Sequence, residues 1–159
     1  MKVLEDSLTD FLWDKIFNSY EFYPSTKEND KLWIKIPIEN KTYRMNSLWN
    51  AEQEALINSF FEQVIPDDMY ALNWQHDCFS YSPKEKIPFR YNYYDEKRDC
   101  NVYFPTYYPD GDYYFFFNHS FNLGIFGHPW RKEIKVMGKN LIDMFEENRV
   151  YLDLEEVNL

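Results

Sequence analysis

Apolar residues recur at helical spacing near the start of the chain. They stand at every fourth position, at Leu8, Leu12, Ile16 and Tyr20. This spacing places them on one face of an amphipathic helix, which is expected to end near Tyr20. Ser7 and Asp10 have the spacing of a capping box, with Asp in place of the usual Glu, and are predicted to begin this helix.

Two more stretches show the same helical periodicity. In the first, apolar residues are spaced by three and four positions, at Leu56, Ile57, Phe60, Phe61, Val64 and Ile65. Asn46 or Ser47 is expected to cap this helix, and Pro66 is expected to end it. In the second, Gly138 is predicted to lead into a helix whose apolar residues are Leu141, Ile142, Met144 and Phe145.

Other segments carry the apolar and aromatic residues that are typical of strands. Residues 32–38 alternate with a period of two, and Pro37 would fit the end or edge of such a strand. Residues 69–81 are expected to form a strand with Tyr70, Leu72 and Trp74 on one face. Further strands are predicted at residues 89–94, 102–108, 113–118, 123–126 and 134–136. The alternation of Val150, Leu152 and Leu154 indicates either a terminal strand or a frayed extension.

The stretch from residue 103 to residue 130 combines many aromatic residues with three of the four glycines. Pro109 to Asp112 predicts a hairpin turn, with Gly111 supplying a positive φ. Gly124 and Gly127 are expected to permit a bend that ends at Trp130. The strand over residues 113–118 is aromatic on both faces, which predicts a central strand that is covered on both sides.

The order of these elements predicts the fold class. A helix, a strand, a helix, several antiparallel strands and a last helix follow one another along residues 1–159. We therefore expect a single α+β domain: one curved, mainly antiparallel sheet with about three helices packed against it. The chain lacks the strand–helix alternation that is typical of a parallel nucleotide-binding sheet.

The 159-residue chain has a formal net charge of −10 at pH 7, from 27 acidic and 17 basic residues. Residues 1–30 contain seven acidic and three basic residues, and residues 140–159 contain six acidic residues and one basic residue. The acidity therefore belongs to the two ends. Nucleic acid is not expected as a ligand, because phosphate binding needs a basic surface. A basic protein partner is compatible with this charge, and plain solubility is the alternative explanation.

Targeting signals and cysteines point to the cytoplasm. No apolar run reaches the roughly 18 residues of a membrane span, so no membrane interaction is expected. Acidic residues near the N-terminus occupy the place where a signal peptide has its apolar core. Cys78 and Cys100 lack metal-ligand spacing and are predicted to be free thiols, with a disulfide between adjacent strands as the alternative.

The histidines are the first candidates for chemistry. Neighbouring strands would have to bring two of them together with a carboxylate to make a metal site. The candidate pocket consists of His76, Asp110, Asp112, His119, His128 and Trp130. The histidines have no recognised ligand spacing, so hydrogen-bonded histidines at strand ends are preferred, and neither a metal nor a cofactor is predicted.

Other catalytic patterns are incomplete. Asp110 and Asp112 resemble the start of a calcium loop, but aromatic residues follow where further ligands are required. The chain has no nucleophile elbow and no phosphate-binding glycine motif, so no catalytic residue is assigned. Paired acids such as Glu52 and Glu54 are expected on solvent faces, where they do no acid–base work.

Two motifs carry a family resemblance. The sequence PDGDYY at Pro109–Tyr114 and the sequence GHPW at Gly127–Trp130, with Trp74-Gln75-His76 as a secondary match, resemble an uncharacterised bacterial family of the DUF2716 type. The resemblance covers most of the chain, from the first helix to Phe145. It implies a compact bacterial cytosolic domain without established catalytic residues. By type, the small, acidic, aromatic-rich chain is also similar to bacterial immunity proteins that neutralise toxins.

The functional prediction is a non-enzymatic protein-binding domain, an immunity-type inhibitor that masks a basic toxin domain. The candidate contacts are the acidic residues near the C-terminus: Asp143, Glu146, Glu147, Asp153, Glu155 and Glu156. The alternative is a small-molecule binder or hydrolase-like enzyme that uses the three histidines with Asp110 or Asp112. A purely structural domain would have neither a partner nor a site.

Overall fold

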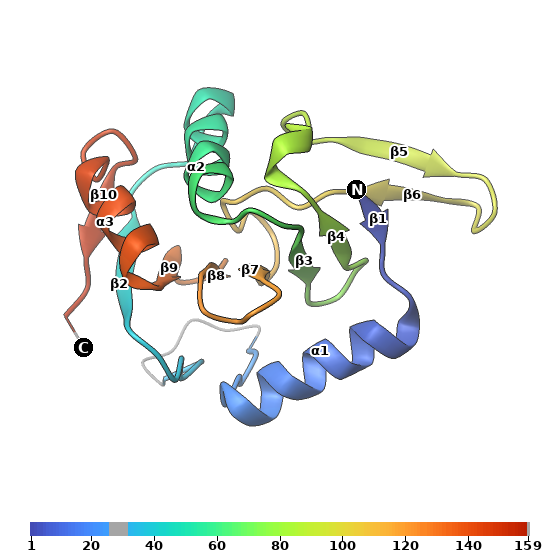
Figure 1. Ribbon diagram of the computed structural model, residues 1–159, viewed down its shortest axis with the longest axis horizontal. Coiled ribbons are helices and arrows are strands. Elements are labelled where there is room, and N and C mark those ends of the chain that lie inside the picture. The colour runs from blue at the N-terminus through green and yellow to red at the C-terminus, as the bar shows by residue number, and fades with distance from the viewer. Residues whose placement is uncertain (26–31, 159) are drawn as a thin grey trace.

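An eight-stranded antiparallel sheet forms the centre of the molecule (Figure 1). The computed structural model describes residues 1–25 and 32–158. The spatial order of the strands is β1-β4-β3-β7-β8-β9-β2-β10. Their bounds are β1 (Lys2–Val3), β2 (Asn40–Met45), β3 (Met69–Asn73), β4 (Phe79–Tyr81), β7 (Tyr114–Asn118), β8 (Gly124–His128), β9 (Glu133–Met137) and β10 (Leu154–Glu156). A separate two-stranded arm consists of β5 (Asn92–Asp95) and β6 (Cys100–Tyr103).

Three α-helices cover the two faces of this sheet in the described part of the chain. Helix α1 (Asp6–Ser19) lies on one face, and helices α2 (Ala51–Val64) and α3 (Lys139–Glu147) lie on the other (Figure 1). A short 3-10 helix, Pro83–Glu85, follows β4. This arrangement confirms the predicted α+β class and its mainly antiparallel sheet.

Strand β7 is the middle of the sheet and is buried on both faces. Phe116 packs into the core on the α2 side, whereas Phe115 and Phe117 pack into the core on the α1 side. All three side chains are 0% exposed. Successive side chains of a strand point to opposite faces, so an uninterrupted aromatic run is stable only between two covered faces. The prediction of a central strand is confirmed.

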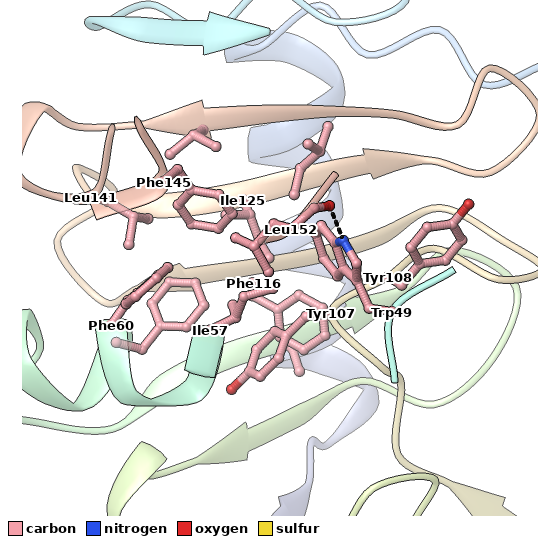
Figure 2. Packing of buried hydrophobic residues seen from close by; sticks show 14 of the residues in the cluster. Trp49, Ile57, Phe60, Tyr107, Tyr108, Phe116, Ile125, Leu141, Phe145 and Leu152 are labelled. Carbon is pink, nitrogen blue, oxygen red and sulfur yellow. Dashed lines mark hydrogen bonds between the residues drawn. The ribbon is translucent and has the colours of Figure 1, made fainter. Parts of the chain in front are cut away.

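The core on the α2 side joins residues that are far apart in the sequence (Figure 2). Ile57 and Phe60 from α2 meet Phe145 from α3 above the sheet, and the rings of Phe60 and Phe145 lie 5.4 Å apart. At the edge of this core, the Trp49 indole Nε1 donates a hydrogen bond of 2.8 Å to the Leu152 carbonyl oxygen (Figure 2). This bond ties the segment before α2 to the C-terminal segment.

The predicted strand at residues 32–38 is wrong. These residues form no strand of the described sheets, although Trp33, Ile34 and Ile36 are buried. They lie instead against the α1 side of the core and bond to the end of α1: the Lys35 N–H donates to the Tyr20 carbonyl oxygen at 2.7 Å. Alternating apolar residues indicate that one side of a segment is buried. An irregular segment that packs over a core has a buried side just as a strand does, so both give the same pattern.

The strands around the aromatic stretch also differ from the prediction. Residues 69–81 form two strands of a hairpin, β3 and β4, and not one strand. The strand predicted at 102–108 ends at Tyr103 and pairs with β5, so no hairpin turns at Pro109–Asp112. Gly111 does not have a positive φ. Pro105 and Pro109 lack the N–H groups that a longer strand would have to contribute.

The bend near residue 130 also has a different basis. Gly124 and Gly127 lie within β8, and the loop that follows is turned by Lys132, at a φ of 51°. The C-terminal segment resolves as the strand β10, which pairs with β2 at the edge of the sheet.

The predicted caps of the first two helices are wrong. The first helix begins after Glu5, and no side chain caps it. The second helix is capped by Asn50, whose side-chain oxygen accepts from the Gln53 N–H while the Gln53 side chain accepts from the Asn50 N–H. Asn46 and Ser47 lie too far upstream to cap it. Gly138 leads into α3 as predicted, with a φ of 98°.

Candidate functional site

His76 lies in the turn after β3, beside two of the predicted carboxylates. Its Nδ1 is 3.7 Å from the Asp112 Oδ2, and Asp112 is only 4% exposed. Burial raises the pKa of the Asp112 carboxyl. Asp110 lies in the same shallow pocket as His76 and accepts a 3.0 Å hydrogen bond from the Tyr114 hydroxyl. The structure therefore brings His76, Asp110 and Asp112 to one end of β7.

His128 belongs to the core on the α1 side of the sheet. Its Nε2 is 3.2 Å from the Tyr113 hydroxyl oxygen, and its Nδ1 accepts a hydrogen bond from the Arg131 N–H at 3.2 Å. The Trp33 ring packs edge-on against it at 5.1 Å. Burial, and then the positive charge of Arg131, lower the pKa of His128 to about 4, so this histidine is neutral at pH 7. Trp130 packs nearby, against Tyr113.

His119 lies at the opposite end of β7. It follows Asn118, the last residue of that strand, and its ring stacks on Tyr70 at 4.3 Å. One histidine thus stands at each end of the strand, and the third, His128, is buried against Trp33 and Tyr113. The three histidines therefore do not form one site, and the described residues contain no group of three or more His, Cys, Asp or Glu that could hold a metal ion. Cys78 and Cys100 are free thiols.

The predicted acidic contacts near the C-terminus are largely occupied by local partners. Glu146 pairs with the Lys41 Nζ at 2.6 Å and accepts a hydrogen bond from the Tyr43 hydroxyl at 2.5 Å. Glu156 pairs with the same lysine at 3.3 Å. These contacts, led by the one with Lys41, lower the pKa of Glu146. This cluster joins α3, β2 and β10, and its lysine neutralises much of the negative charge of the two glutamates.

The other four acids of that group are exposed. Asp143 pairs with Lys139 at 3.3 Å, and Asp153 accepts a hydrogen bond from the Ser47 hydroxyl at 2.8 Å. Glu147 and Glu155 have no ion-pair partner among the described residues. The available negative charge at this end of the molecule is therefore smaller than the composition indicates.

Helix α1 presents a different acidic surface. Asp6, Asp10 and Asp14 are exposed on its outer side and have no ion-pair partner in the described part of the chain. Two phenylalanines share this side: Phe11 is 62% exposed and Phe17 is 38% exposed. We call these five residues the α1 acidic face. The sequence could have revealed this surface, because the i, i+4 spacing of the three aspartates predicts that they share one face of a helix.

A cleft beside α2 has a volume of about 430 Å³. One wall is the row Glu54, Asn58 and Glu62 on α2, and the opposite wall includes Phe89 and Phe104. We call this cavity the α2 cleft. Its volume falls in the usual range of small-molecule pockets, roughly 300–1,000 Å³.

Glu54 is the most unusual residue of the α2 cleft. The prediction that Glu54 lies on a solvent face is wrong: it is 7% exposed because the segment before β7 covers it. Its carboxylate accepts hydrogen bonds from the Tyr107 N–H at 2.7 Å and from the Tyr108 N–H at 3.0 Å. Burial raises the pKa of Glu54 to about 7, although these two donors act in the opposite direction.

A chain of hydroxyl groups lies next to Glu54. The Tyr81 hydroxyl is 3.0 Å from the Tyr107 hydroxyl, which donates to the Asn58 Oδ1 at 2.7 Å. The Asn58 amide in turn donates to the Pro83 carbonyl oxygen at 2.9 Å. These polar groups satisfy one another and hold the wall of the cleft in place. No local motif marks them, since their three segments (α2, residues 81–83 and residue 107) are distant in the sequence.

No helix in the described residues is long and apolar enough to cross a membrane.

Comparison with known proteins places the chain in a family. Over 82 residues, 52% of this chain and 46% of the relative, it is 37% identical to a protein of Bacillus subtilis (strain 168) called "Uncharacterized protein YxiI". The match thus spans about half the length of that protein. No solved structure matches the chain. The model of the family DUF2716, described as a protein of unknown function, matches residues 3–142. The chain therefore belongs to the DUF2716 family.

Proposed function

We propose that this protein is a non-enzymatic binding protein of the cytoplasm, an immunity-type inhibitor that masks a basic toxin domain. The α1 acidic face is the observation that carries the proposal. It combines three aspartates without ion-pair partners in the described residues with two exposed phenylalanine rings. A basic protein surface is the complement of such a face.

The two residue types on this face would serve different steps of binding. Aspartates speed the encounter with a basic surface and orient it, and their effect weakens with salt. Aromatic side chains contribute most of the binding energy when a partner buries them. Phe11 is the stronger anchor candidate, because no other aromatic ring of the described residues packs on it, whereas Phe17 lies 5.2 Å from Phe22.

The C-terminal acids support this proposal less strongly than the α1 acidic face. Glu146 and Glu156 share Lys41, and a partner cation would have to displace that lysine. Glu147 and Glu155 retain free charge and would add to the long-range field. We therefore assign the direct contact to α1 and only steering to the C-terminal acids.

Affinity capture followed by a protection assay tests this function. The tagged protein is used to capture partners from lysate of its own cells, and each captured protein is then expressed alone and with this chain. We expect a captured domain with a basic surface that is toxic alone and harmless with this chain. The variant Asp6→Asn/Asp10→Asn/Asp14→Asn is expected to weaken binding at least tenfold at low salt.

The matched control is the double variant Glu147→Gln/Glu155→Gln, which removes exposed acids from the other end of the molecule. It is expected to bind within about threefold of the unmodified protein. A captured partner that is not toxic, or binding that survives the triple substitution unchanged, would rule out the proposed function.

A further inference from the structure

Residues of α2 line the α2 cleft. Helix α2 lies on the opposite face of the sheet from α1 (Figure 1), so the proposed docking surface does not use the cleft. Its body is apolar and aromatic: Tyr81, Ile87 and Phe104 line it. A cavity of about 430 Å³ accommodates a small molecule of one ring with a short chain.

Acceptor oxygens line the helical wall of the cleft. Glu54, Asn58 and Glu62 are four residues apart, so they stand above one another on the same side of α2. No cation of the described residues lies within 4.0 Å of either glutamate. Buried carboxylates are normally paired with a cation, whereas the hydrogen-bond partners of Glu54 among the described residues are the two backbone N–H groups of Tyr107 and Tyr108.

The cations near the cleft are placed at its opening. Arg90 is 60% exposed, lies over the Phe89 ring, and pairs with Asp110 at 3.6 Å. Lys86 is exposed and lines the same edge. The interior therefore has a carboxyl group and aromatic rings, whose faces attract cations, and the positive charges stay in solvent.

We propose that the α2 cleft binds a small organic cation, an aromatic or aliphatic amine, with its ammonium group beside Glu54 and its apolar body against Tyr81 and Phe104. The ammonium would complete the coordination of a carboxylate that now has only neutral donors. Glu62 would contribute a second acceptor at the mouth of the cleft.

The titration of Glu54 predicts the direction in which the affinity of the cleft for a cation changes with pH. Burial holds the pKa of Glu54 at about 7, so the carboxyl is largely protonated at pH 6 and largely ionised at pH 8. The groups that act on it are the Tyr107 and Tyr108 N–H groups, Asp110 and Arg90. A cation prefers the ionised carboxyl, so its binding tightens as the pH rises through this range. An anion would show the reverse dependence.

Isothermal titration calorimetry with three aromatic probes of similar size tests the proposal. Phenethylamine is the cation, phenethyl alcohol the neutral control, and phenylpropanoate the anion. We expect phenethylamine to bind about tenfold more tightly at pH 8 than at pH 6, as the ionised fraction rises from about one tenth to about nine tenths. Phenethyl alcohol and phenylpropanoate are expected to bind at least tenfold more weakly at pH 8.

Substitutions on one helix separate the site from the rest of the surface. Glu54→Gln is expected to weaken phenethylamine binding about tenfold at pH 8 and to abolish the pH dependence. Glu52→Gln removes an exposed acid two residues away and is expected to change neither. Ala55→Trp places a large ring at the exposed mouth of the cleft and is expected to abolish binding without loss of the fold.

Ala55→Trp keeps the test informative even if Glu54→Gln fails to fold. Equal or tighter binding of phenylpropanoate, absence of phenethylamine binding, a flat pH dependence in the unmodified protein, or binding that persists in Ala55→Trp would each overturn the proposal.

Discussion

Gly138 shows how a single residue determines a junction between elements. It connects β9 to α3, and its N–H donates to the Glu39 carbonyl oxygen at 2.9 Å while its φ is 98°. Residues with a Cβ rarely adopt this φ. A Cβ at this position would also lie 2.5 Å from the Asn122 carbonyl oxygen. Both the dihedral angle and the space therefore require glycine here.

The substitution Gly138→Ala is expected to lower the free energy of unfolding by about 2 kcal/mol or more, because it adds strain and a backbone clash. Urea denaturation measures this change. Gly111→Ala is the matched control: its Cβ meets no atom within 4 Å and its φ is not in the left-handed region. We expect Gly111→Ala to stay within about 1 kcal/mol of the unmodified protein, or to be slightly more stable. Equal losses in both variants would contradict this account of Gly138.

The start of α2 shows how an element is defined by its cap. Asn50 and Gln53 satisfy each other's backbone N–H groups in a capping box. Asn46 stands four residues earlier, and its side chain makes no hydrogen bond to the described residues. Both asparagines are exposed and of a type that caps helices, so composition alone does not distinguish them. The distinction matters because α2 forms a wall of the cleft.

We expect Asn50→Ala to reduce the free energy of unfolding by about 1 kcal/mol, because it leaves the Gln53 N–H without its acceptor. Asn46→Ala serves as the control and is expected to change stability by less than about 0.5 kcal/mol. Thermal denaturation followed by circular dichroism reports both. A loss at Asn46 as large as that at Asn50 would show that the cap lies elsewhere.

At the scale of the whole molecule, one sheet separates two hydrophobic cores. Ile16 of α1 and Ile57 of α2 are both 0% exposed, each in the core on its own side of the sheet. Strand β7 contributes side chains to both cores and therefore couples their formation. The cores are nevertheless distinct in their direct contacts, since no buried residue is shared between them.

The matched pair Ile16→Val and Ile57→Val tests this organisation. Each substitution is expected to cost roughly 0.5–1.5 kcal/mol in the free energy of unfolding. The double variant should show the sum within about 0.5 kcal/mol, because residues without shared partners contribute independently. Each variant is also expected to unfold in one transition by tryptophan fluorescence and by circular dichroism. A deviation from additivity of more than about 1 kcal/mol would mean that the two cores touch through the sheet.

Sequence patterns predicted those features that depend on neighbouring residues. The helical stripe of α2 and the central position of β7 follow from local periodicity, because the spacing of apolar residues along the sequence depends directly on whether one face or both faces of an element are buried. The segment at residues 32–38 shows the limit of this reasoning. Its alternation was read as a strand, but a segment that covers a core has the same pattern.

The candidate sites depended on contacts that the order of residues does not reveal. Glu54 resembles its exposed neighbour Glu52 in sequence, and it is buried only because residues 107 and 108 fold over it. Glu146 and Glu156 looked like open acids until the fold placed Lys41 between them.

By itself, the sequence determined the α+β class, the central aromatic strand and the family resemblance, since each of these depends on composition or on short-range spacing. Only the tertiary structure decided which acids keep their charge in solvent, which carboxyl is desolvated, and that the three histidines lie apart. The contacts of Glu54 with Tyr107 and of Glu146 with Lys41 join residues that are more than 50 positions apart in the sequence, and such proximity is a result of folding.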